Sequence, residues 1–146
     1  MEKKELTEVL SEHKKWLADN STGKKANLRS ADLWSADLGS ADLQDANLRD
    51  ANLRSANLRD ASLRSANLSS ADLRSADLRN ADLWDADLWD AELRHTNFYK
   101  TAIRIKSLST YLSFRFVSSY YTYSAEQQCD LINNLLEHVY MCNIGE

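Results

Sequence analysis

The amino-acid sequence predicts an all-β solenoid, a tube made by a chain that coils around one axis, with a cap at each end. The main observation is a five-residue unit that recurs without interruption over residues 26–105. Each unit also places a small residue two positions before a large apolar one. The remaining positions carry mostly Asp, Asn, Ser and Arg, and the first three of these residue types favour turns.

The five-residue period excludes the two regular secondary structures. In an α-helix, five residues advance by about 500°, so the recurring leucines would wind around the helix and form no buried stripe. In a flat strand, side chains alternate, so successive leucines would face opposite sides of the sheet. The direction of the chain must therefore be reset once in each unit, as it is in a coil with corners.

The large apolar residue of each unit is the expected core of the tube. It is leucine in fourteen of sixteen units, and the small residue before it is alanine in all units except the last two. Because residues two apart in an extended segment point to the same side, both face inward. Stacked coils then share a core that no single unit could form. The markers of this core are Leu28, Leu48, Leu68, Leu88, Phe98 and Ile103.

The stretch ADLRSADLRNADLWDADLWD, residues 71–90, resembles the A(D/N)LXX motif of pentapeptide repeat proteins. The resemblance implies a right-handed quadrilateral parallel β-helix, in which four units make one coil, and thus about four coils here. A 20-residue coil would stack Asp37, Asn57, Asp77 and Asn97 in one column. A 25-residue coil would separate like charges equally well, so the surface pattern leaves the number of faces open.

Three segments are expected: an N-terminal capping helix in residues 1–25, the tube in residues 26–105, and a C-terminal cap in residues 106–146. Apolar residues from Leu6 to Leu17 have helical spacing, and Gly23 follows as a stop. The last segment predicts a strand or hairpin and then a helix, and its surplus of aromatic residues suggests a homodimer through this end. The candidate cap or dimer contacts are Tyr111, Phe114, Phe116, Leu131, Leu135 and Val139.

Composition and motifs argue against catalysis. The chain has 146 residues and a net charge of −4, which disfavours direct nucleic-acid binding. No apolar run is long enough to span a bilayer, the N-terminus is unlike a secretory signal, and two cysteines suggest free thiols, so we expect a cytoplasmic protein. The three histidines, His13, His95 and His138, lie in different segments, and there is no glycine-rich phosphate loop. We therefore expect no enzyme activity, no cofactor and no metal.

Surface recognition remains, and arginine and tryptophan mark the candidate partner surface. On a four-sided coil, Arg54, Arg74 and Arg94 would stack on one face and Arg59 and Arg79 on the next. These arginines could instead pair with the neighbouring Asp50, Asp60, Asp72 and Asp77. Outward-facing Trp84 and Trp89 would either join the partner surface or lie beneath the chain's own C-terminal segment.

Three hypotheses of function follow. The preferred one is a rigid, non-catalytic protein-binding or scaffold module with an unidentified protein partner. The family resemblance implies an alternative, a DNA mimic that binds DNA gyrase and protects it from quinolones or toxins. Mimicry needs a strongly negative rod, whereas residues 26–105 hold 13 acidic and 10 basic side chains. The third is a structural solenoid without a dedicated partner.

Overall fold

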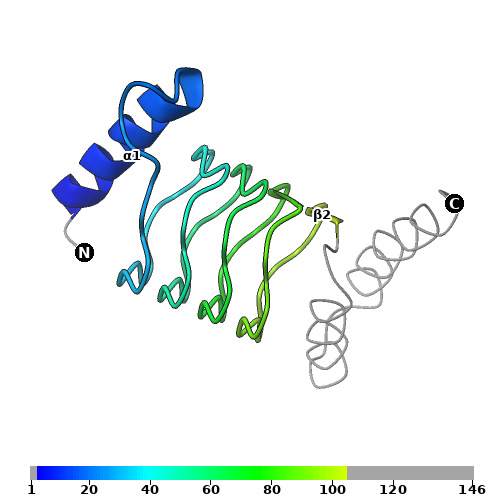
Figure 1. Ribbon diagram of the computed structural model, residues 1–146. Coiled ribbons are helices and arrows are strands. Elements are labelled where there is room, and N and C mark those ends of the chain that lie inside the picture. Colours follow the sequence, from blue (N-terminus) through cyan, green and yellow to red (C-terminus); the bar gives the residue numbers. More distant parts are fainter. Residues whose placement is uncertain (1–2, 105–146) are drawn as a thin grey trace, which may run out of the picture.

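A helix followed by a stack of coils makes up the part of the chain that the structure describes, residues 3–104 of a computed structural model (Figure 1). The helix, α1, spans Lys3–Ala18 and lies at one end of the stack. Two short strands, β1 (Asp82–Trp84) and β2 (Ala102–Arg104), pair in parallel with Leu83 opposite Ile103. The expected C-terminal cap, with all six of its candidate contacts (Tyr111, Phe114, Phe116, Leu131, Leu135 and Val139), lies outside the described residues.

The coil length is 20 residues. Parallel bridges join residues 20 apart all along the tube, from Asn27 with Asn47 to Asp77 with Asn97. Backbone hydrogen bonds follow the same register, because Leu28 N–H donates to Asn47 O at 2.7 Å and Asn47 N–H donates to Ala26 O at 3.0 Å. Four pentapeptides therefore make one coil, and the 25-residue alternative is wrong.

Each pentapeptide contains one corner. At the first corner, Ala31 N–H donates to Leu28 O at 3.1 Å, and Ser30 between them has a φ of 55°. A positive φ at the third residue is the feature of a type II turn. The same positive φ recurs at every fifth residue as far as Lys100. The corners leave so little straight chain that, between residues 3 and 104, most pairing is by single bridges and only β1 and β2 are long enough to form strands.

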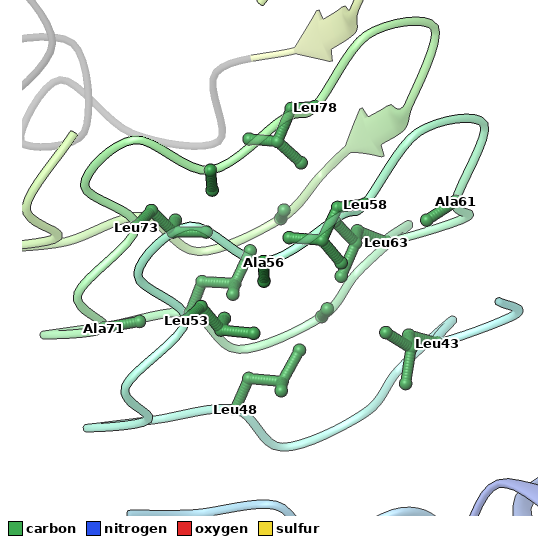
Figure 2. Packing of buried hydrophobic residues seen from close by; sticks show 14 of the residues in the cluster. Leu43, Leu48, Leu53, Ala56, Leu58, Ala61, Leu63, Ala71, Leu73 and Leu78 are labelled. Carbon is green, nitrogen blue, oxygen red and sulfur yellow. The ribbon is translucent and has the colours of Figure 1, made fainter. Parts of the chain in front are cut away.

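The inside of the coils is filled by leucine and alanine (Figure 2). The six core markers are all buried, and Leu48 and Leu68 are wholly inaccessible to solvent. Figure 2 shows leucines of successive coils, such as Leu58 and Leu78, directed into the same interior. In the last coil, threonines replace alanine, and their hydroxyls donate to Leu73 O and Leu78 O of the coil before. The inward direction of the small and large residues is confirmed.

The helix α1 packs on the first coil. Leu6 belongs to the same apolar cluster as the tube's leucines, and Val9 and Leu10 pack against it. The connection folds back at Gly23, whose φ is 65°, and Lys24 N–H donates to Glu12 O at 3.1 Å. Helix and tube thus share one continuous core.

Candidate functional surface

The residues that follow the large core residue of each pentapeptide form four columns along the corners of the tube, because every coil repeats the backbone of the one before. The hydrogen bonds Ser35 N–H to Arg54 O and Ser40 N–H to Arg59 O set this register. The second corner column is Trp34, Arg54, Arg74 and Arg94, and the third corner column is Gly39, Arg59, Arg79 and Tyr99. We name the side between these two columns the third face, which carries Asp37, Asn57, Asp77 and Asn97.

Three of the candidate arginines are held by acidic residues of their own pentapeptide. Arg74 Nε donates to Asp72 Oδ1 at 2.7 Å, and Arg79 Nε donates to Asp77 Oδ1 at 2.8 Å. Arg94 Nε lies 3.2 Å from a carboxylate oxygen of Glu92. These hydrogen bonds hold the pKa of Asp72 and of Asp77 below the ordinary range. The alternative of ion pairs with neighbouring aspartates is therefore correct for Arg74 and Arg79, whereas Arg94 pairs with Glu92, which was not an expected partner.

Arg54 and Arg59 are different. Both are exposed, and neither forms an ion pair with any residue between 3 and 104. Their charges act at longer range, since Arg54 lowers the pKa of Asp72 and Arg59 lowers that of Asp77. They lie on the two corners that flank neutral Asn57, whose side-chain amide donates to Asp37 at 2.7 Å. The third face thus has two uncommitted positive charges in its second coil.

The tryptophans do not share that face. Trp84 lies in the fourth corner column, which is Gln44, Arg64, Trp84 and Arg104. Trp89 lies in the first corner column, which is Arg29, Arg49, Ser69 and Trp89, so the two tryptophans flank the opposite side of the coil. Trp89 is 53% exposed, whereas Trp84 is half-buried with the Arg64 guanidinium 5.8 Å from its ring centre. The sequence hypothesis of one surface that combines Arg54, Arg59, Arg74 and Arg79 with both tryptophans therefore needs correction, because the tryptophans lie on the two corners that flank the side opposite the third face.

The described residues contain no group of three His, Cys, Asp or Glu side chains that could hold a metal ion. His13 lies in α1 and His95 on an exposed corner, while His138 and both cysteines lie outside the described range. Between residues 3 and 104, no helix combines the length and apolar character needed to span a bilayer.

Two features of the surface could not be read from the spacing. The neutral Asn57 between two free arginines matters only once the 20-residue register is known. Arg64 was not a candidate, yet it pairs with Asp82 at 3.3 Å as well as contacting Trp84.

Five-residue units that coil into a parallel solenoid, with columns of mostly polar residues at the corners, place this chain among the solenoid repeat proteins. A family model described as pentapeptide repeats matches residues 41–80 and 71–104. A crystal structure of alr5209, a pentapeptide repeat protein from Nostoc PCC 7120, is 35% identical with a TM-score of 0.56. The match covers 64% of this chain and 74% of that one. The chain belongs to the pentapeptide repeat family.

Two further solved structures are more distant. Rfr23, a pentapeptide repeat protein from the cyanobacterium Cyanothece 51142, is 29% identical with a TM-score of 0.46, over 57% of this chain and 63% of that one. QnrB1, a plasmid-mediated fluoroquinolone resistance protein, is 21% identical with a TM-score of 0.32, over 59% of this chain and 51% of that one. Neither similarity is close enough to carry a functional argument. The search of curated proteins found no match.

Proposed function

We propose that the chain is a non-catalytic binding module, a right-handed quadrilateral tube capped by α1, whose third face binds an acidic segment of a partner protein. The observation that supports this function is the pair Arg54 and Arg59, exposed on neighbouring corners and free of the ion pairs that hold Arg74 and Arg79. The partner surface is therefore smaller than the sequence suggests.

The backbone of the tube supports binding because it is already ordered. Each coil is tied to the next by hydrogen bonds of 2.7 to 3.0 Å at every pentapeptide. On the side of this chain, association then costs little backbone entropy, and the main ordering is that of the two arginine side chains. Arginine suits this role because its guanidinium can bind a carboxylate through two parallel hydrogen bonds.

The surrounding charges favour a polypeptide with separated carboxylates over a nucleic acid. Asp37 and Asp77 lie on the third face on either side of Asn57. A continuous polyphosphate would approach these carboxylates as well as the arginines and would be repelled. A partner whose acidic side chains meet only the two arginines avoids that repulsion.

Titration of a labelled Glu-rich peptide, followed by fluorescence anisotropy, tests this function. The double variant Arg54→Ser and Arg59→Ser should weaken binding about tenfold or more, since each hydrogen-bonded charge pair contributes about 1 kcal/mol. The control variant Arg29→Ser and Arg49→Ser removes the same charge from the first corner column, where both arginines lie 3.5 Å from an Asp50 oxygen. An equal loss in both variants would indicate non-specific charge attraction and would refute the proposed surface.

The gyrase hypothesis requires a surface of the opposite charge. A DNA mimic must present continuous negative charge, whereas the arginines of the second and third corner columns occupy the middle of the tube. We therefore expect the folded protein to leave DNA supercoiling by gyrase unchanged, with or without a quinolone. Inhibition or protection at micromolar protein would favour the mimic over the acidic-partner module.

A further inference from the structure

The histidine of α1 is sealed between the helix and the first coil. His13 has no solvent-exposed surface, and its Nδ1 accepts a hydrogen bond from the Ala26 backbone N–H at 3.1 Å. Its ring stacks on Trp16 with 5.7 Å between the ring centres. Within the described part of the chain, Nε2 has no hydrogen-bond partner. Ala26 is the first residue of the tube, so this hydrogen bond joins the helix directly to the first coil.

The hydrogen bond fixes the protonation state of His13. A nitrogen that accepts a hydrogen bond carries no proton, so His13 is neutral with its single proton on Nε2. A second proton would have to bind at Nδ1, directly opposite the Ala26 N–H donor. The docked arrangement would then contain two opposed donors and a buried cation, and both are unfavourable.

The charged groups around the ring do not remove this conflict. Burial is the largest influence and lowers the pKa of His13, and the charge of Lys25 lowers it further. The Gln44 backbone and the carboxylates of Asp42 and Asp45 raise the pKa, although Nε2 forms no hydrogen bond of good geometry with Gln44. The pKa remains below its ordinary value of 6.5 because desolvation exceeds these opposing effects.

We propose that His13 makes the docking of α1 on the first coil sensitive to protons, so that the helix is held at neutral pH and released in mild acid. Release would uncover the outer backbone edge of the first coil, together with apolar side chains near Leu6 and Ala26. Such an edge can pair with another chain. The device is independent of the third face and of any acidic partner.

The direction of the pH dependence follows from the difference in proton binding between the docked and the released state. A lowered pKa in the docked state means that the released state binds more protons, so docking is strongest above the ordinary pKa of 6.5. Each pH unit below that value reduces the docking equilibrium constant about tenfold, until the pH reaches the pKa of the docked state.

A pH series of amide hydrogen exchange at Ala26, with an NMR titration of the His13 ring, tests the proposal on the full chain. The Ala26 amide should progressively lose protection as the pH falls below about 6.5, and His13 should titrate below its ordinary pKa. His13→Asn keeps an acceptor near the position of Nδ1 but cannot titrate, so its Ala26 protection should not vary with pH. His95→Asn, on an exposed corner, should behave as the unchanged protein does.

Two results would overturn the proposal. One is a His13 pKa at or above 6.5 while Ala26 stays protected, and this measurement does not depend on whether a variant folds. The other is the same acid-induced loss of protection in His13→Asn as in the unchanged protein.

Discussion

One residue in each pentapeptide from Ser30 to Lys100 holds a left-handed backbone, although none of these residues is glycine. A left-handed conformation costs an L-residue about 1–2 kcal/mol, and Asn and Asp tolerate it best because their side chains bond locally. From Ser30 to Asn80 this cost is offset, because the backbone N–H of the corner residue donates a hydrogen bond to the neighbouring coil. Ser65 is typical, since its N–H donates to Trp84 O at 2.8 Å.

Substitution of Ser65 tests this explanation. Ser65 is exposed with a φ of 55°, so Ser65→Val adds a β-branched side chain that clashes with the left-handed backbone without disturbing the core. We expect the free energy of unfolding to fall by about 1–3 kcal/mol in urea denaturation. Ser65→Asn is the matched control and should change stability by less than about 0.5 kcal/mol. Equal effects of Val and Asn would show that backbone strain is not what selects the corner residue.

At the scale of elements, the contact between α1 and the tube depends on one glycine in their connection. A Cβ at position 23 would lie 2.3 Å from the Glu12 carbonyl oxygen, and the positive φ adds strain. Gly23→Ala should therefore weaken the docking of α1 and lower the melting temperature. Gly39→Ala is the control, because its Cβ would meet side-chain atoms and no backbone atom, with the Asn57 amide nitrogen at 3.0 Å and Asp37 Oδ1 at 3.4 Å, and its φ is not positive. A Gly23→Ala variant as stable as Gly39→Ala would contradict this role of the connection.

The sequence predicts most elements because the repeat itself encodes them. Leucine every five residues requires a corner in each unit, and the apolar spacing from Leu6 onward requires a helix close to the observed Lys3–Ala18. The coil length could not be derived in the same way, since charge separation is equally good for 20 and 25 residues. The grouping of both tryptophans with the arginines was wrong for another reason, because the four-sided coil was applied to the arginines and not to the tryptophans, which fall in the other two corner columns. No pattern in the sequence predicts the hydrogen bond between His13 and Ala26, since a histidine in an apolar stripe resembles any core residue.

At the scale of the whole molecule, the charged residues are distributed unevenly between the coils, which the net charge alone does not show. The first coil carries Asp32, Asp37, Asp42 and Asp45 against a single arginine. The second coil has an arginine after the leucine at all four corners, Arg49, Arg54, Arg59 and Arg64. Arg49 and Arg64 pair with Asp50 and Asp82, which leaves the positive charge concentrated on the third face. A net charge of −4 therefore does not prevent an acidic partner from binding to this side.

The central claim is tested most directly by adding the Glu-rich peptide to the isotope-labelled protein and mapping which amide chemical shifts of the protein change. The largest shifts should fall on Arg54, Asn57 and Arg59, and they should diminish as added salt screens the charges. Smaller changes should appear at Arg74 and Arg79, which already hold their own aspartates. Shifts centred on Trp89 and the first corner column, or no shifts on the third face at a saturating peptide concentration, would contradict the claim that this face binds an acidic partner.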